Sequence, residues 1–463
     1  MSNSGNTFNA IKTILNTRSL AVVGASNNIG KFGGKTMQTI INGKYSGQIF
    51  PVNPKSDEIM GIKAYKHLMD IPDTVDAVVI IVPAKFVADV LREAAKKGVK
   101  GAIILSAGFK EFGRIDLEEE LQEISKTYGI RLMGPNIQGV TYIPNKMNAM
   151  FFPVLEQLGP LAVITQSGSV TAALAEWAER DGVGITAAVN LGNQADICES
   201  DYINYFANDS NVGAIVCYLE GIKDGPKFLS TLKRAVAKKP IVILKTGRTE
   251  AGAKSAASHT GSMAGNHAVF KGICRQYGVI SVKELSHLYD AAKGLALIKQ
   301  PKGNRVVILS TSGGSATLAS DEAESQGLVF PSLPAETKEE LGTIGLDIMT
   351  HITNPMDMPG DNSHIYLKAA QVIDKYNIAD IILFSFADPV IDADTDFVNK
   401  AGKLKASVTT CYFGGGELEL SSVQVMGRAG MAVFPTPERA IRAIGAAVQR
   451  SMYLKCRDMD KEV

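Results

Sequence analysis

The segment KSAASHTGSMAGN (residues 254–266) places one histidine, His259, among small residues whose pattern predicts neither helix nor strand. Its neighbours Gly261 and Ser262 can donate hydrogen bonds to an anion held on the ring. A neutral imidazole is a good nucleophile toward phosphorus near neutral pH. We therefore predict that His259 accepts a phosphoryl group and that Gly261 and Ser262 contact it. Isolated histidines are usually structural or solvated, which is our interpretation of His67, His287, His351 and His364.

A carboxylate at the end of a buried strand is the second candidate for this chemistry. A nucleophilic imidazole is oriented by a carboxylate that accepts from its other ring nitrogen. Glu220 ends the apolar run in GAIVCYLEG, and the carboxyl edge of a parallel sheet is where such sites form. We predict that Glu220 orients His259, with a surface salt bridge as the alternative.

Two Ser-Gly turns follow apolar runs and precede runs of small residues. TQSGSV contains Ser167, Gly168 and Ser169, and STSGGS contains Ser312, Gly313 and Gly314. Hydroxyl groups, backbone amides and the helix dipole at such a turn make an anion site. An ordinary serine N-cap is the alternative for each turn. Because the pattern occurs twice, we predict phosphate-binding sites at both.

A glycine-rich turn, VVGASNNIGKFGG, follows the first predicted strand and allows a phosphate to approach the backbone closely at Gly24 and Gly33. Its spacing is not GxGxxG. The second strand ends in FPVNPK, with no acidic residue to accept from ribose hydroxyls. Lys31 and Lys55 instead place cations where an additional phosphate could bind. The pattern therefore favours CoA or NADP over NAD, with a plain strand-to-helix turn as the alternative.

The composition is that of an ordinary globular protein. The 463 residues are 45% hydrophobic and 21% charged, and the net charge of +1 gives no general basic field for nucleic acid. No apolar run is long enough for a membrane span, and the polar start MSNSGNTFNA does not resemble a signal peptide. The five scattered cysteines predict a reducing, cytoplasmic location and no metal centre.

Short apolar runs alternate with amphipathic runs along the chain, which predicts an α/β fold with doubly wound parallel sheets. Three strand-like segments recur in order: LAVITQSG with VVILSTSGG, GAIVCYLEG with DIILFSFAD, and PIVILKTGR with SVTTCYFGG. We interpret this as an internal duplication of one α/β domain, joined by the polar linker LIKQPKGNR (residues 297–305).

With these residues assembled, the chain resembles the α subunits of the ADP-forming, or nucleoside-diphosphate-forming, acyl-CoA synthetases of the acetate–CoA ligase type. These are relatives of succinyl-CoA synthetase. The resemblance covers nearly the whole chain, in the family's order: VVGASNNIGKFGG, VNPKSDEIMGIKAY, LSAGF, MGPNIQG, TQSGSV, NLGNQADI, YLEGIKD, ILKTGRTEAGAKSAASHTGS and NPMD.

The resemblance implies a Rossmann-like CoA-binding domain over residues 1–145. Two flavodoxin-like ligase domains would follow, over residues 146–300, with the phosphohistidine loop, and 301–463. It implies that His259 carries the phosphoryl group, that Glu220 orients it, and that Asn136 lies beside the acyl or thiol end of CoA. The CoA contacts that it implies are Gly24, Ala25, Ser26, Lys31, Gly33, Asn53, Lys55, Val82, Pro83, Ser106, Ala107, Gly108, Phe109 and Asn136.

The resemblance also implies a partner. Family members use an ATP-grasp domain, which this sequence does not show, so we expect it on a separate β subunit in an α₂β₂ complex. ADP or ATP with Mg²⁺ would bind there. The expected reaction converts acyl-CoA, ADP and phosphate into a small carboxylic acid, CoA and ATP. Two alternatives remain open: a CoA-binding acyltransferase or regulatory protein without phosphotransfer, and an NADP oxidoreductase.

Overall fold

The computed structural model describes residues 3–152, 154–254 and 266–459. His259, Gly261 and Ser262 lie outside these residues. The chain divides into two compact units. The first contains residues 1–176, 185–239 and 243–277, and the second contains residues 177–184, 240–242 and 278–463.

The first sheet contains five parallel strands in the order β2-β1-β5-β6-β7. Its strands are buried on both faces, as their nearly continuous apolar sequences predict. The elements of this region are α1 (Asn3–Leu15), β1 (Ser19–Val23), α2 (Phe32–Asn42), β2 (Gln48–Val52), β3 (Glu58–Ile59), β4 (Ile62–Lys63), β5 (Ala77–Ile80), α3 (Val87–Lys96), β6 (Gly101–Ile104), α4 (Ile115–Tyr128) and β7 (Arg131–Met133).

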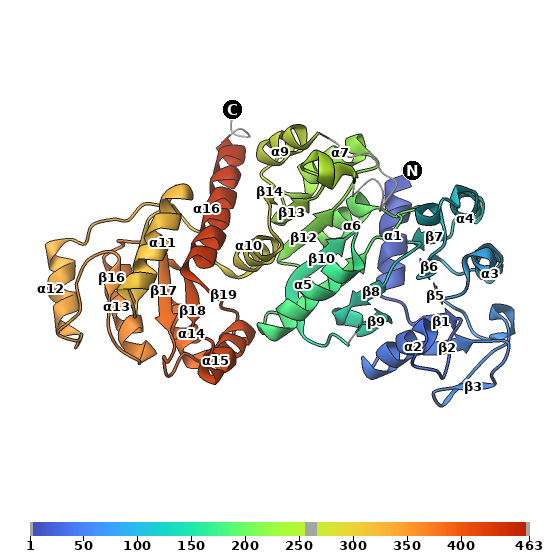
Figure 1. The fold of residues 1–463 in the computed structure, drawn as a ribbon, viewed down its shortest axis with the longest axis horizontal. Helices are drawn as coiled ribbons and strands as arrows, with labels where there is room; N and C mark the ends of the chain where they lie inside the picture. Colours follow the sequence, from blue (N-terminus) through green and yellow to red (C-terminus); the bar gives the residue numbers. More distant parts are fainter. Residues whose placement is uncertain (1–2, 153, 255–265, 460–463) are drawn as a thin grey trace. The chain divides into compact units, whose positions relative to one another are not determined.

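The second sheet has seven strands in the order β14-β13-β12-β10-β11-β8-β9. In Figure 1 its strands run from teal (β8 and β9) through green to yellow-green (β14). Its elements are β8 (Gly139–Tyr142), β9 (Met147–Met150), β10 (Leu158–Thr165), α5 (Gly168–Arg180), β11 (Ile185–Asn190), α6 (Glu199–Phe206), β12 (Ala214–Leu219), α7 (Gly225–Ala235), β13 (Ile241–Lys245), α9 (His267–Gln276), β14 (Ile280–Val282) and α10 (Leu285–Leu297).

This second sheet is mixed, whereas the first and third sheets are parallel throughout. Strand β8 pairs antiparallel with both β9 and β11, whereas β10 pairs in parallel with β11 and β12. Only residues 143–146 connect β8 to β9, and a parallel crossover needs about a dozen residues. The domain boundary that we expected at residue 145 lies in this short connection.

The third sheet has five parallel strands in the order β16-β15-β17-β18-β19. Strands β15, β17 and β18 hold the same places in it as β10, β12 and β13 hold in the second sheet, in agreement with the duplication inferred from sequence. Its elements are β15 (Val306–Ser310), α11 (Gly313–Ser325), α12 (Ala335–Thr343), β16 (Met356–Asp357), α13 (Ser363–Lys375), β17 (Ile381–Ala387), α14 (Thr395–Ala401), β18 (Ser407–Phe413), α15 (Glu417–Arg428), β19 (Val433–Phe434) and α16 (Pro437–Met459).

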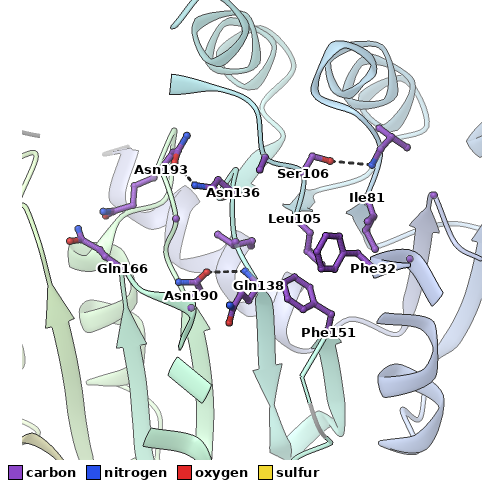
Figure 2. A pocket seen from close by; sticks show the side chains of 18 of the residues that line it. Phe32, Ile81, Leu105, Ser106, Asn136, Gln138, Phe151, Gln166, Asn190 and Asn193 are labelled. Carbon is purple, nitrogen blue, oxygen red and sulfur yellow. Dashed lines mark hydrogen bonds between the residues drawn. The ribbon is translucent and has the colours of Figure 1, made fainter. Parts of the chain in front are cut away.

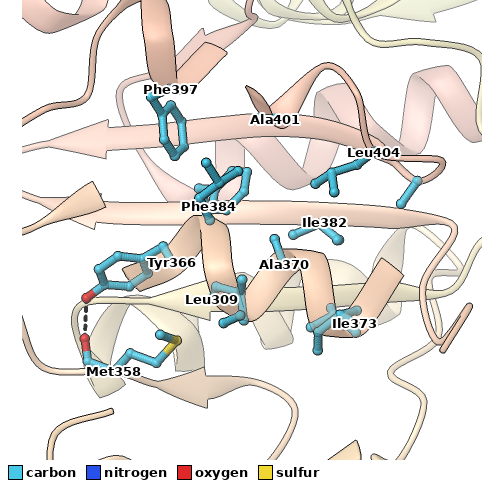
Figure 3. Close-up of a cluster of buried hydrophobic side chains, with 14 of the residues drawn as sticks. Leu309, Met358, Tyr366, Ala370, Ile373, Ile382, Phe384, Phe397, Ala401 and Leu404 are labelled. Atoms are coloured by element: carbon cyan, nitrogen blue, oxygen red, sulfur yellow. Dashed lines mark hydrogen bonds between the residues drawn. The ribbon is translucent and has the colours of Figure 1, made fainter. Parts of the chain in front are cut away.

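An apolar core holds one face of the third sheet against α13 and α14 (Figure 3). Ile382 and Phe384 of β17 pack with Ile373 of α13 and Phe397 of α14, and all four are fully buried. The rings of Phe384 and Phe397 lie 5.0 Å apart in an edge arrangement. Polar atoms in this core are paired: the Tyr366 hydroxyl donates to the carbonyl of Met358.

A buried ion pair lies in the second unit. The Lys293 ammonium on α10 is fully buried, 3.0 Å from Oδ2 of Asp181, and it also donates to the carbonyl of Val433. The Tyr289 hydroxyl donates to the same carboxylate oxygen at 3.0 Å. Burial raises the pKa of Asp181, but the charge and hydrogen bond of Lys293 outweigh burial and hold that pKa below 3.8.

Replacing Lys293 by methionine is expected to destabilise the second unit by about 3 kcal/mol, because the Asp181 charge loses its buried cation and keeps, among the described residues, only the exposed Arg180 as an ion-pair partner. Since the pKa of Asp181 is depressed on folding, the contribution of its charge is complete above the unfolded value of 3.8. It is lost as pH falls through the lower folded value. Calorimetry of thermal unfolding measures the effect, with the exposed Lys338→Met as control. Equal unfolding temperatures for the two variants would contradict the prediction.

Candidate active site

A cavity of about 600 Å³ opens in the first unit where loops of the first and second sheets meet (Figure 2). The order in which successive strands are added to the sheet reverses between β1 and β5 in the first sheet, and between β10 and β12 in the second. Ligands bind at such reversals, outside the carboxyl ends of the strands. The lining comprises Gly24, Lys31, Phe32, Gly33, Ile81, Val82, Pro83, Leu105, Ser106, Ala107, Asn136, Ile137, Gln138, Phe151, Gln166, Gly168, Asn190, Gly192, Asn193, Gln194, Gly221 and Lys223.

The glycine-rich turn after β1 forms one wall. Gly24 has φ +90°, and a Cβ there would lie 2.1 Å from the carbonyl oxygen of Ile81. A Cβ on Gly33 would lie 2.0 Å from the carbonyl oxygen of Gly24. Both positions therefore require glycine. The rings of Phe32 and Phe151 lie 4.7 Å apart beside this turn and give the cavity an aromatic edge.

The expected CoA contacts divide into two groups. The cavity lining includes Gly24, Lys31, Gly33, Val82, Pro83, Ser106, Ala107 and Asn136. It does not include Ala25, Ser26, Asn53, Lys55, Gly108 or Phe109.

The residues outside the lining have structural partners. The Phe109 side chain is fully buried in the core of the first sheet. Asn53 donates to the carbonyl of Ala25 at 2.8 Å, so it joins the loop after β2 to the loop after β1. Lys55 is exposed on that loop, and its backbone N–H donates to Oδ1 of Asn53.

The turn Ser167–Ser169, where we expect phosphate to bind, lies at the start of helix α5. Gly168 lines the cavity, and the Ser167 and Ser169 hydroxyls lie 3.2 Å apart. A Cβ on Gly168 would lie 2.0 Å from Cδ of Gln138, so the Gln138 amide covers the first turn of the helix. Oε1 of Gln138 is buried without a hydrogen-bond partner among the described residues.

Glu220 lies at the carboxyl end of β12, 6% exposed, beside the lining residue Gly221. The Gln166 side chain clamps this strand end: its Oε1 accepts from the backbone N–H groups of Glu220 and Gly221, and its Nε2 donates to the Gly221 carbonyl at 2.8 Å. The structure thus brings Glu220 to the same cavity edge as the turn that begins α5.

A buried cation lies beside Glu220. Lys245 ends β13, is 6% exposed, and donates to the carbonyls of Glu220 at 2.6 Å and Thr246 at 2.8 Å. Burial lowers the pKa of Lys245, and the Glu220 charge opposes this effect. The ammonium fixes the ends of β12 and β13 together, at the point from which the chain leads to His259.

The second Ser-Gly turn lies in the other unit. Ser312 precedes α11, and Gly313 and Gly314 form its first turn. Oδ2 of Asp357 lies 2.9 Å from the position that a Cβ on Gly313 would occupy. The third sheet reverses between β15 and β17, so this turn has the same topological place as Ser167–Gly168.

No helix among the described residues is long and apolar enough to cross a membrane. Within residues 3–152, 154–254 and 266–459, no cluster of three or more His, Cys, Asp or Glu side chains could hold a metal ion.

Two family models match the chain. Residues 18–143 match a CoA-binding domain, and residues 158–295 match the succinyl-CoA ligase-like flavodoxin domain. These segments contain the first sheet and most of the second, including the loops that line the cavity.

Two relatives that are similar over more than nine-tenths of this chain are named acetate–CoA ligases. The chain is 36% identical to the acetate–CoA ligase [ADP-forming] I subunit alpha of Pyrococcus furiosus, covering 96% of this chain and 98% of that one. It is 37% identical to acetate–CoA ligase [ADP-forming] I of Archaeoglobus fulgidus, covering 92% of this chain but 61% of the relative.

A solved structure of acetyl-coenzyme A synthetase 1 from Ca. Korarchaeum cryptofilum, in complex with phosphate and ADP, superposes with a TM-score of 0.89 at 33% identity. It covers 96% of this chain and 98% of its own.

A CoA-binding domain followed by a succinyl-CoA ligase-like flavodoxin domain, with the cavity between the loops of these two domains, defines an acid–thiol ligase. The chain belongs to the family of alpha subunits of ADP-forming acetate–CoA ligases. This membership supports the ligase interpretation over a CoA-binding acyltransferase or regulatory protein without phosphotransfer.

Proposed function

We propose that the chain binds acyl-CoA in the cavity and interconverts acyl-CoA, ADP and phosphate with a small carboxylic acid, CoA and ATP. The observation that carries the proposal is the single cavity lined by the glycine-rich turn, Asn136, the first turn of α5 and Gly221. In this proposal CoA and an anion would share one space, beside the end of the strand that leads to Glu220.

Three steps complete the proposed reaction. A phosphate oxygen attacks the thioester carbonyl carbon and the C–S bond breaks, which gives an acyl phosphate and the CoA thiolate, which takes up a proton. A ring nitrogen of His259 then attacks phosphorus, and the P–O bond to the acyl group breaks to release the carboxylate. Finally, a β-phosphate oxygen of ADP attacks the phosphohistidine and regenerates the free ring.

The first turn of α5 supports the anion role, because Ser167 and Ser169 offer hydroxyls to phosphate and the first N–H groups of a helix have no partner within the helix. We assign Gly261 and Ser262 to the phosphohistidine and Ser312, Gly313 and Gly314 to a second phosphate position. Of the expected CoA contacts outside the lining, Ser26, Asn53, Lys55 and Gly108 would bind the parts of CoA that extend beyond the cavity, whereas the buried side chains of Ala25 and Phe109 support these loops.

We propose that an ATP-grasp β subunit binds ADP or ATP with Mg²⁺ and forms an α₂β₂ complex with this chain in the cytoplasm. The match covers 98% of the length of a relative that is named as an alpha subunit. It covers only 61% of the length of a relative that lacks this designation. We assign CoA binding to residues 1–145 and the ligase functions to residues 146–300 and 301–463.

The purified chain alone is expected to bind CoA but to form no ATP from acetyl-CoA, ADP and phosphate. Addition of an ATP-grasp subunit from an ADP-forming acetate–CoA ligase should restore turnover. A coupled ATP assay measures the reaction, and calorimetry with CoA provides the binding control. Full turnover by the chain alone would remove the need for a β subunit, and absence of CoA binding would refute the proposed function.

Lys31→Ala is expected to weaken CoA binding about fivefold at low salt, because an exposed cation on a phosphate contributes roughly 1 kcal/mol. Lys31 is exposed and lines the cavity. Lys55 lies outside the lining, so Lys55→Ala should have the smaller effect. Titration calorimetry at two salt concentrations measures both, with the exposed Lys126→Ala as control. A Lys31 effect that does not shrink at high salt would contradict a phosphate contact.

A further inference from the structure

A hydrogen-bond network leads from two glutamates to the cavity. Asn193, in the loop after β11, uses its Nδ2 group to donate to Oε2 of Glu111 at 2.5 Å and to Oε2 of Glu118 at 2.8 Å. Its Oδ1 accepts from Nδ2 of Asn136 at 3.3 Å (Figure 2). Asn136 and Asn193 both line the cavity, whereas Glu111 and Glu118 do not.

The two carboxylates determine which way the Asn193 amide faces. An ionised carboxylate only accepts hydrogen bonds, and the two N–H bonds of the amide are both used by the glutamates. Turning the amide over would place its carbonyl oxygen against two acceptor oxygens. Burial raises the pKa of Glu111, but hydrogen bonds from Asn193 and from the backbone N–H of Gly108 outweigh it and hold the pKa below its usual value. Glu118 is 4% exposed.

The backbone around Asn136 is equally fixed. Asn136 has φ +61°, its N–H donates to the carbonyl of Ser106 at 2.9 Å, and the N–H of Asn193 donates to the carbonyl of Pro135 at 2.9 Å. Gly192 has φ +53°, and a Cβ there would lie 2.5 Å from the carbonyl oxygen of Asn136. The two loops therefore approach each other closely, and their fixed backbones place the side chain of Asn136 against that of Asn193.

The orientation of the Asn193 amide determines the orientation of the Asn136 amide. Because Asn193 presents its carbonyl oxygen, Asn136 must turn its Nδ2 toward Asn193. Oδ1 of Asn136 has no partner among the described residues and belongs to a side chain that lines the cavity. The group left for a ligand at this position is therefore an acceptor.

We propose that Glu111 and Glu118 act through Asn193 as positioning residues that make Asn136 present its carbonyl oxygen to a hydrogen-bond donor on the pantetheine arm of CoA. The donor is the thiol S–H or an amide N–H. Asn136 thus recognises the CoA arm and is not an oxyanion donor for the acyl carbonyl. This assignment rests on the proposed binding of CoA in the cavity.

The test is a rescue experiment on the full chain. Asn136→Asp puts an oxygen opposite Oδ1 of Asn193, which the glutamates hold in place, so CoA affinity should fall at least tenfold. In the Glu111→Gln/Glu118→Gln background, Asn193 can turn over and donate to the new carboxylate. The same substitution should then cost threefold or less. Titration calorimetry measures the four dissociation constants, and circular dichroism checks folding.

The control background is Glu119→Gln, an exposed glutamate next to Glu118 on α4, in which the tenfold loss should persist. If the buried Glu118→Gln does not fold, Glu111→Gln alone provides the background, with a partial rescue expected. Equal losses from Asn136→Asp in all backgrounds, or no loss in any, overturn the inference. Absence of CoA binding by the unaltered chain overturns the proposed function instead.

Desulfo-CoA, in which hydrogen replaces the thiol, identifies the donor. If the thiol donates to Asn136, the effect of Asn136→Asp should be confined to CoA and disappear with desulfo-CoA. If a pantetheine amide donates, both ligands should lose affinity equally. Loss with desulfo-CoA but not with CoA fits neither donor and contradicts the proposed contact.

Discussion

Replacing His259 by alanine is expected to abolish phosphoenzyme formation and to reduce ATP synthesis by the chain with its β subunit more than about a thousandfold. The ring is the proposed nucleophile, and alanine offers no group that can hold phosphorus covalently. CoA affinity should remain within about twofold, because the described residues that line the cavity proposed for CoA come from a part of the chain that precedes His259. Those residues all lie between positions 24 and 223 of the chain. Labelled phosphate with acetyl-CoA, followed by acid and base treatment, measures the phosphoenzyme.

The chemical stability of the label separates histidine from a carboxylate. A phosphoramidate is acid-labile and base-stable, so label on the peptide containing SAASHTGS should be lost in acid and survive in base. His267→Ala is the matched control, since His267 begins α9 and has no proposed part in phosphoryl transfer. Normal labelling of the His259→Ala protein, or label on another peptide, would remove His259 from the mechanism.

The fold was largely predictable, because its signals are local. Strands such as β1 and β5 are continuous apolar runs, and the duplication was visible from three recurring segments. The hairpin β8–β9 was missed, since GVTY and MNAM carry no strong strand pattern. The strand character of β8 depends on pairing with β11, more than 30 residues away in sequence, and that of β9 depends on pairing with β8.

The candidate site was predictable only where the type and position of a residue in the sequence indicate its chemical role. Glycines and serines at strand ends indicated the turn after β1 and the start of α5. The amides Gln138, Gln166 and Asn193 gave no such signal, because a glutamine or asparagine in a sequence is more often a solvated surface residue. Their roles come from partners far apart in the chain, such as Gln166 with Glu220 and Asn193 with Glu118. A single sequence does not contain those pairings.

Glu220→Gln is expected to slow phosphoenzyme formation by about 10²–10⁴-fold, which is the scale for a carboxylate that orients a catalytic imidazole. The backbone clamp should survive, because Gln166 binds the N–H groups of Glu220 and Gly221 and not the carboxylate. The substitution therefore removes charge and leaves the strand end in place. Rapid-quench labelling across a pH series measures the rate.

The pH series distinguishes orientation from a general loss of structure. Removing the Glu220 charge removes the effect that opposes burial at Lys245, so the pKa of Lys245 should fall further in the variant. Lys245 then loses its proton at lower pH, its hold on the strand ends weakens, and the residual rate should decline earlier on the alkaline side than in the unaltered protein. Glu250→Gln, an exposed carboxylate on the segment after β13, should change neither rate nor profile. Labelling by Glu220→Gln at the unaltered rate would show that another group orients His259.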